Sequence, residues 1–222
     1  MEAFSFLDPI NSLPGIKAGW IERIPDLEIR SDRDSAMRKL RPTHQNEIDT
    51  FAGPGSPWWR AEQIHACEVA LVPTDDVILA PDELPVVPDV DGLITNEVGQ
   101  VLSIYVADCG AIWLADQKTG AIGLLHSGKK GTECNILGEA VDMMHKRFGS
   151  NPEDIIAVLS PCIRPPDYEV DFASDITRQA EESQLGDFID CGLNTASDLE
   201  RFYSYRVEKG RTGRMMAMMV RE

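Results

Sequence analysis

The stretch of residues 91–131 constrains the fold more than any other part of the chain, because it holds three short apolar runs separated by polar breaks. Residues 101–107 form the first run, in which apolar side chains dominate and alternate in the manner of a β-strand. Two further runs, at residues 111–115 and 121–125, flank a turn cluster at residues 116–120. This arrangement predicts a strand followed by a β-hairpin.

The predicted hairpin brings two reactive side chains together. If its turn is centred between Gln117 and Lys118, Cys109 and His126 face each other where the two strands end. Side chains at strand ends can leave the core, so a thiol beside an imidazole is a candidate chemical centre.

The rest of the chain alternates between helical and strand-like patterns. Helices are expected over residues 31–41, 131–149, 171–185 and 194–203, and strands over residues 63–69, 155–159, 188–191 and 215–220. Pro42 is expected to end the first helix, and the proline-rich residues 73–88 are expected to be a surface excursion. No glycine-rich phosphate loop follows a strand, so the pattern favours a mixed sheet with helices on its outer faces.

The net charge of the chain makes some classes of binding partner unfavourable. The 222 residues carry a formal net charge of −16, and such a surface repels nucleic acid and anionic membranes. The N-terminal residues 1–10 lack the basic start of a signal peptide, and no apolar run is long enough to span a membrane. Five widely spaced cysteines do not suggest a disulfide framework, which favours a cytoplasmic location.

Eight short motifs follow one another between Gln63 and Arg214, at residues 63–65, 91–95, 107–109, 126–131, 161–163, 168–170, 202–206 and 212–214. In this order they resemble the YfiH-like family. That family was first described as polyphenol oxidoreductase laccases and later as zinc-dependent purine nucleoside enzymes.

The resemblance implies a fold and a domain organisation. The fold class is α+β, a mixed β-sandwich flanked by helices in α/β/β/α layers. Residues 1–222 would form a single domain, with residues 1–60 as a divergent N-terminal part and residues 63–222 as the recognisable core.

The resemblance also implies a cofactor and a reaction. The family binds one zinc ion through two histidines and a cysteine, which correspond here to His65, Cys109 and His126. Its reactions are phosphorolysis of adenosine, inosine and methylthioadenosine, and deamination of adenosine. The expected partners are therefore a purine nucleoside and phosphate, with neither nucleic acid nor membrane, and the oligomeric state is left open.

Zinc suits this set of donors. Three protein ligands leave one coordination position for water or substrate, as in catalytic zinc sites, and zinc lowers the pKa of a bound water to about 7. A multicopper centre needs many more imidazoles than the four that the chain contains, which are His44, His65, His126 and His145. Copper is therefore expected only as an adventitious substitute for zinc.

The motifs that are expected to bind substrate differ from the family pattern at two places. Lys130 stands where the family has an arginine, so the planar fork that suits phosphate is lost while the charge is kept. The family's N-terminal Thr-Arg-x-Gly-Gly segment is not recognisable, although Arg23 is a candidate remnant. Lys130, Arg164 and Arg206 are the predicted phosphate- or substrate-binding residues.

Two alternatives use the same side chains differently. Cys109 and His126 can act without metal as the catalytic nucleophile and base of a hydrolase or amidase, although His65 then has no role. A metal-stabilised binding protein without turnover is the other alternative. Cys67 is a conceivable fourth, inert metal ligand, and Asp108 is expected to have a structural role beside Cys109.

Overall fold

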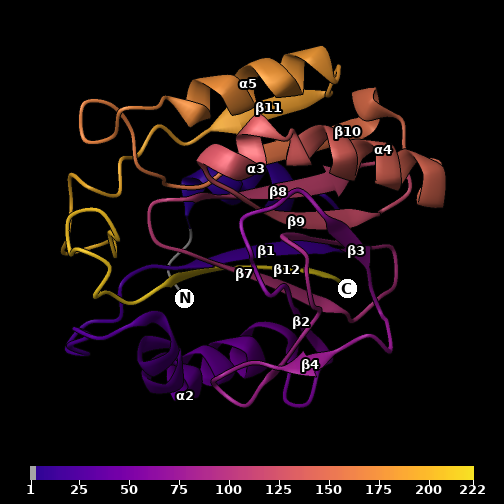
Figure 1. Ribbon diagram of the computed structural model, residues 1–222. Helices are drawn as coiled ribbons and strands as arrows, with labels where there is room; N and C mark the ends of the chain where they lie inside the picture. The colour runs from indigo at the N-terminus through magenta and orange to yellow at the C-terminus, as the bar shows by residue number, and fades with distance from the viewer. Residues whose placement is uncertain (1–3) are drawn as a thin grey trace.

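Two mixed β-sheets pack face to face in the computed structural model, which describes residues 4–222 (Figure 1). The four-stranded sheet has the order β1 (Ile16–Ile21), β12 (Met215–Arg221), β7 (Val101–Val106) and β2 (Trp58–Arg60). The six-stranded sheet has the order β11 (Asp187–Asp190), β10 (Ile155–Leu159), β8 (Gly110–Asp116), β9 (Ile122–Ser127), β6 (Gly92–Thr95) and β3 (Val69–Leu71). A separate two-stranded ribbon, β4 (Ile78–Leu79) and β5 (Pro85–Val86), lies within the proline-rich excursion.

Helices cover the outer faces of both sheets. Figure 1 shows α2 (Arg33–Ala52) below the four-stranded sheet, and three helices over the six-stranded sheet, which are α3 (Lys129–Glu133), α4 (Ile136–Phe148) and α5 (Phe172–Glu182). The short helix α1 (Asp8–Asn11) precedes β1, and 3₁₀ turns occupy Ser5–Leu7 and Pro152–Asp154. These layers confirm the expected α/β/β/α arrangement. None of the helices in residues 4–222 is both long and apolar enough to cross a bilayer.

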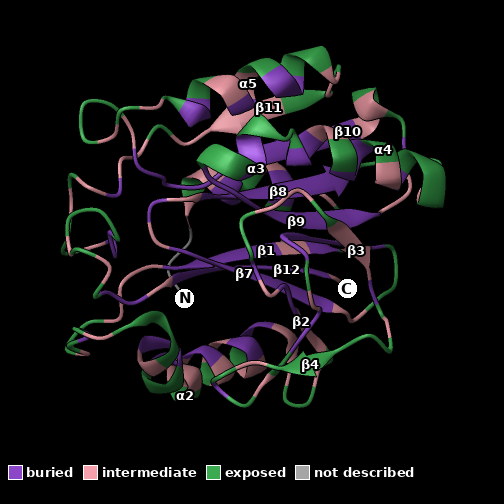
Figure 2. Cartoon of the chain, in the orientation of Figure 1, coloured by how far each residue is buried: buried purple, intermediate pink, exposed green. Residues whose placement is uncertain are grey.

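Strand β8 is buried on both faces, which explains its continuous apolar sequence. Ala111, Trp113 and Ala115 belong to the core between the two sheets. Ile112 and Leu114 belong to the second core, which lies between the six-stranded sheet and its covering helices. Figure 2 shows the central strands of both sheets buried, the edge strands β3 and β11 partly exposed, and the outward faces of the helices exposed.

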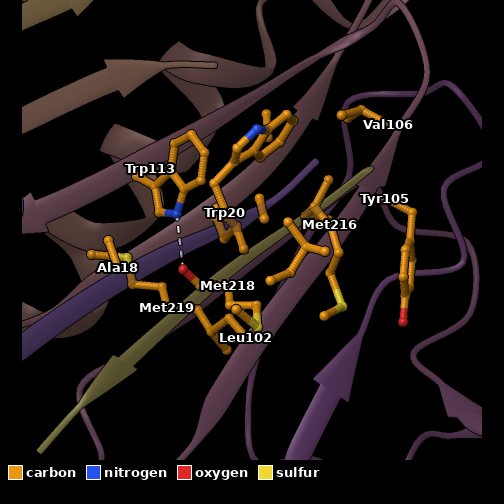
Figure 3. Packing of buried hydrophobic residues seen from close by; sticks show 14 of the residues in the cluster. Ala18, Trp20, Leu102, Tyr105, Val106, Trp113, Met216, Met218 and Met219 are labelled. Atoms are coloured by element: carbon orange, nitrogen blue, oxygen red, sulfur yellow. Dashed lines mark hydrogen bonds between the residues drawn. The ribbon is translucent and has the colours of Figure 1, made fainter. Parts of the chain in front are cut away.

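The core between the sheets is built around two tryptophans and the methionines of β12 (Figure 3). The rings of Trp20 and Trp113 meet edge to face with centroids 5.9 Å apart. Trp113 Nε1 donates a hydrogen bond of 2.9 Å to the carbonyl oxygen of Met218, which satisfies the only polar atom of this buried ring and links the two sheets. Residues 215–220 therefore form a buried strand, as the sequence predicts.

The predicted hairpin is confirmed, but its register is shifted. Strands β8 and β9 pair with Ala111 opposite His126 and Gly110 opposite Ser127, so the turn is centred between Lys118 and Thr119, one residue later than predicted. Backbone hydrogen bonds from Asp116 to residue 121 and from residue 120 to Asp116 close the longer turn. Cys109 is therefore placed before β8 and is not the partner of His126 in the sheet.

Helix α2 extends well beyond its predicted end. It continues to Ala52 with Pro42 inside it, and Asp32 caps its start by accepting a hydrogen bond of 3.0 Å from the Ser35 backbone N–H. Pro42 removes one internal hydrogen bond, but the second half of the helix buries Ile48 and Phe51. Tertiary packing therefore outweighs the local helix-breaking signal.

The other predicted elements differ from the structure chiefly at their boundaries. Residues 131–149 form two helices because Asn135 adopts a left-handed conformation (φ 58°) between them and caps α4. Gly149 ends α4 in the left-handed conformation, as expected. The helix predicted over residues 194–203 is wrong, since this segment consists of successive turns.

Candidate metal centre

Three side chains from separate segments converge at one end of the sandwich. The candidate ligand atoms of His65, Cys109 and His126 all lie within 4.8 Å of one another. His65 comes from the loop before β3, Cys109 from the connection between β7 and β8, and His126 from the end of β9. His126 is buried, Cys109 is half-buried and His65 is exposed, so the cluster is open to solvent on the side of His65.

Asp91 organises the two histidines of this cluster. Its Oδ1 atom lies 2.7 Å from Nδ1 of His126, and the carboxylate also accepts hydrogen bonds from the backbone N–H groups of Ile64, His65 and Ala66. The Asp91 side chain is fully buried. Because Nδ1 of His126 is engaged by Asp91, Nε2 is the nitrogen available to a metal ion.

The segment predicted as a strand over residues 63–69 is a loop up to residue 68, and only its last residue enters β3. Gln63 and His65 have φ values of 64° and 63°, which are incompatible with an extended strand. The loop's backbone N–H groups bond to the Asp91 carboxylate instead of a neighbouring strand, which is the physical reason for the difference. Gln63 fixes the other end of the loop, since its side-chain amide exchanges two hydrogen bonds with the backbone of Tyr105.

The position of Cys109 depends on a close approach to Gly128. A Cβ atom on Gly128 would lie 2.4 Å from Sγ of Cys109, so a side chain at this position would displace the thiol. Asp108, which has a φ of 84°, turns its carboxylate away to accept hydrogen bonds of 2.7 Å from Thr195 Oγ1 and from the backbone N–H of Arg206. Asp108 thus ties the C-terminal loops to the segment that carries Cys109.

Cys109 and His126 are electrostatically coupled. Burial raises the pKa of the Cys109 thiol, but the charge of His126 and hydrogen bonds from His126 and His65 outweigh it and lower the pKa to about 6. Burial lowers the pKa of His126, while the Cys109 thiolate and the Asp91 carboxylate raise it to about 9. Without metal, the pair is therefore a thiolate and an imidazolium at neutral pH.

The predicted substrate residues do not all gather at this centre. Arg164 is held by a two-pronged ion pair with Asp190, and Arg206 pairs its guanidinium with Glu169 on the surface. Lys130 is exposed on α3, two residues after Gly128. The roles of Lys130, Arg164 and Arg206 in phosphate binding stay predictions.

Two other predicted residues lie elsewhere. Arg23, the candidate remnant of an N-terminal motif, pairs with Glu208 at 2.8 Å and lies over the ring of Tyr203. Cys67 is not part of the cluster of three candidate ligands found among residues 4–222. Burial raises the pKa of the Cys134 thiol, and the neighbouring Cys67 raises it further.

Sequence reasoning missed the part played by Asp91. Its only signal is its position at the start of a buried strand, in the motif of residues 91–95. Nothing local shows that its carboxylate serves both a histidine 35 positions away and a loop 25 to 27 positions away.

The chain is similar to known proteins over most of its length. It matches the sequence pattern of the family described as "Multi-copper polyphenol oxidoreductase laccase" over residues 30–188 and 171–222. It is 30% identical to the purine nucleoside phosphorylase YlmD of Geobacillus stearothermophilus, over 88% of this chain and 82% of that protein. It is also 30% identical to the purine nucleoside phosphorylase YlmD of Bacillus subtilis, over 85% of this chain and 78% of the relative.

Solved structures confirm the fold. The crystal structure of YlmD from Geobacillus stearothermophilus superimposes with a TM-score of 0.81 over 95% of this chain and 93% of that one, at 23% identity. The crystal structure of YfiH from Bacillus licheniformis superimposes with a TM-score of 0.77, over 93% of both chains, at 22% identity.

Proposed function

The chain belongs to the family described as multi-copper polyphenol oxidoreductase laccase, and we propose that it is a zinc-dependent purine nucleoside phosphorylase. The convergence of His65, Cys109 and His126 within 4.8 Å, with Asp91 orienting one imidazole, is the observation that carries this proposal. The names of the two relatives that are 30% identical support the choice of reaction.

The donor set fits one zinc ion and not several copper ions. Two imidazoles and a thiolate are ligands of catalytic zinc sites. The Asp91 carboxylate, which lies 2.7 Å from Nδ1 of His126, supplies the support that a zinc-binding imidazole usually has. The two remaining histidines of the chain are remote from the cluster: His44 is buried in α2, and His145 bonds through Nδ1 to the carbonyl oxygen of Ser150. Residues 4–222 therefore lack the clustered histidines that a multicopper centre requires, although the family's description names one.

The proposed reaction is phosphorolysis. The bond between C1′ of the ribose and the purine nitrogen breaks as a phosphate oxygen bonds to C1′, and the base leaves with the electron pair and takes up a proton. Zinc, when bound, supplies a Lewis acid that polarises a substrate atom or activates water. His65, Cys109 and His126 would hold the metal, Asp91 would fix the nitrogen that His126 presents, and the solvent-open side beside His65 would admit the nucleoside.

Deamination of adenosine fits the same open coordination position. In that reaction water replaces the amino group at C6 of the purine, giving inosine and ammonia. We propose it as a second activity on adenosine-type nucleosides, with methylthioadenosine as a further phosphorolysis substrate.

The experiment compares metal content and turnover in the wild type, Cys109→Ala and Cys191→Ala. Cys191 is half-buried like Cys109 but lies outside the cluster, which makes it the matched control. We expect about one zinc per chain in the wild type and in Cys191→Ala, and release of adenine or hypoxanthine that depends on phosphate. Cys109→Ala should lose both the metal and the activity.

Other outcomes would support the alternatives. Zinc without turnover, together with retained purine binding, would show a metal-stabilised binding protein. The pKa of about 6 for Cys109 favours the metal-free hydrolase as the second candidate, because it describes an activated thiolate beside an imidazolium. Metal-free protein whose Cys109 is alkylated stoichiometrically by iodoacetamide, and which cleaves amides or esters, would replace the zinc proposal by that one.

A further inference from the structure

Arg214 is an arginine beside the candidate metal centre, and its charge has no carboxylate partner among the residues that the structure describes. It immediately precedes β12, whose first residue, Met215, pairs with Val106 at the end of β7. By continuing this antiparallel register, Arg214 is next to Ala107, two residues before Cys109. The structure thus brings the last of the family-like motifs, residues 212–214, to the segment that carries a candidate metal ligand.

Within the described part of the chain, residues 4–222, the guanidinium of Arg214 is bonded only to backbone oxygens. Its Nη1 atom donates to the carbonyl oxygens of Thr212 and Gly213, at 3.2 and 2.8 Å. Among residues 4–222, Arg214 takes part in no ion pair, whereas Arg23, Arg164 and Arg206 are each paired with a carboxylate. Those two bonds leave the rest of the fork free to bind a ligand.

The surroundings of Arg214 favour an anion. Burial lowers the pKa of Arg214 and the nearby charge of Arg33 lowers it further, while the charges of Cys109 and Asp108 raise it. Arg33 is also without a carboxylate partner among the described residues and donates from Nη2 to the backbone oxygen of Glu62, close to the His65 loop. Two guanidinium groups within electrostatic range repel each other, and an anion bound between them would relieve that repulsion.

Arg214 is also held in place by the loop that precedes it. Gly213 packs against the ring of Tyr203, where a Cβ atom would come within 2.5 Å of the ring. The loop of residues 204–213 is anchored to the centre because the backbone N–H of Arg206 donates to Asp108. The charge is therefore fixed relative to Cys109, as a preorganised binding group requires.

We propose that Arg214, assisted by Arg33, binds the orthophosphate that attacks the nucleoside. This inference rests on the proposed phosphorolysis. The planar fork of an arginine suits phosphate oxygens, and Lys130 does not provide such a fork. In a chain with a net charge of −16, a phosphate dianion needs a local cation, and Arg214 provides one at the candidate metal centre.

The test uses zinc-loaded protein with Arg214→Gln, Arg214→Lys and the control Arg178→Gln. Arg178 is an exposed arginine on α5 whose partners, Asp175 and Glu182, belong to the same helix. We expect Arg214→Gln to raise the KM for phosphate roughly tenfold to a hundredfold with little change in the KM for adenosine. Arg214→Lys should recover part of this loss, and Arg178→Gln should match the wild type.

A binding measurement separates this inference from the proposed function. Equilibrium dialysis with labelled orthophosphate alone, without nucleoside, should show binding in the wild type and its loss in Arg214→Gln, whether or not the protein turns over purines. Circular dichroism checks that both proteins are folded. The inference would be overturned if the wild type and Arg214→Gln then bound phosphate with equal affinity. Binding of AMP in place of orthophosphate would overturn it as well, since the site would then recognise a nucleotide.

Discussion

The Asp91 carboxylate binds His126 through Nδ1 at 2.7 Å and, with the same two oxygens, holds the backbone of the loop that carries His65. One buried side chain therefore positions two of the three candidate metal ligands. His65 itself makes no hydrogen bond to Asp91 through its ring, so its place depends on the backbone of its loop.

Asp91→Asn should lower zinc affinity by about 10- to 100-fold, because an amide supports the orientation of His126 and the three N–H donors less well than a carboxylate. Competition with a chromophoric chelator measures the affinity. Asp187→Asn, an exposed change on β11, should bind zinc like the wild type. Wild-type affinity in Asp91→Asn would show that the carboxylate does not orient the ligands.

Gly128→Ala should reduce zinc occupancy while the protein stays folded. The new Cβ atom would lie 2.4 Å from Sγ of Cys109, and the backbone at Gly128 (φ −112°, ψ −159°) is allowed for alanine, so the clash with the thiol is the main effect. Metal analysis after dialysis measures the occupancy. Gly55→Ala adds a Cβ atom that meets no atom within 4 Å but strains a left-handed backbone (φ 79°), so it controls for a general loss of stability and should keep its zinc. Full occupancy in Gly128→Ala would mean that the thiol is not a ligand.

When zinc binds at pH 7.5, His126 should release about one proton per chain, in addition to the proton lost by a zinc-bound water whose pKa is about 7. With a pKa of about 6, Cys109 is already a thiolate at this pH, whereas His126, with a pKa of about 9, is protonated and must lose its proton to bind zinc. Well above pH 9 His126 is already neutral, so its contribution should disappear while that of the zinc-bound water remains. Titration calorimetry in buffers of different ionisation enthalpy counts the protons, and zinc binding at pH 7.5 without proton release would contradict the coupled pair.

His44→Phe should make the protein less sensitive to acid. Burial and the charge of Arg60 lower the pKa of His44 to about 3, against 6.5 in the unfolded chain. Between these values the unfolded state holds a proton that the folded state lacks, so wild-type stability falls as the pH falls, by about 1.4 kcal/mol per pH unit from this group. Both ring nitrogens lack hydrogen-bond partners among residues 4–222, so phenylalanine loses no bond.

Urea unfolding at pH 6.5, 5.5 and 4.5 tests the effect of His44. The difference in stability between His44→Phe and the wild type should grow in favour of the variant at each step. A difference that does not change with pH would show that His44 is protonated in the folded protein.

Removing one partner of the buried ion pair between Arg60 and Asp82 should cost about 3–5 kcal/mol of unfolding free energy. The two charged groups meet at 3.1 and 2.5 Å, with only 4% and 2% of their side chains exposed. Asp82→Ala would leave the guanidinium buried without a counterion. Asp175→Ala, which breaks a surface pair with Arg178, should cost less than about 1 kcal/mol in the same urea experiment.

The hairpin and the proximity of Cys109 to His126 could be predicted from the sequence, because apolar alternation and a turn cluster determine them locally. The one-residue error in the turn did not separate the pair, since both residues lie at strand ends. The approach of His65 could not be derived from periodicity. It depends on a loop with two left-handed residues built on a distant carboxylate, and only the family resemblance indicated it.

The substrate side was harder to predict for a related reason. Arg164 and Arg206 are suitable phosphate ligands by residue type, but Asp190 and Glu169, 26 and 37 positions away in the sequence, pair with them in the fold. Arg214 gives no local sign that it lacks such a partner. Whether a cation is free to bind a ligand depends on long-range pairing, which a single sequence does not reveal.

Strand β12 lies between β1 and β7, and β1 has no other strand partner in its sheet. During translation, residues 16–21 must therefore wait, unpaired, until residues 215–221 have left the ribosome. Cys109 follows β7, and the pairing of β12 with β7 brings Arg214 to it, so the final geometry around the candidate metal centre is set at the same late moment. The four-stranded sheet, and with it the arrangement beside Cys109, can therefore be completed only after β12 has been synthesised.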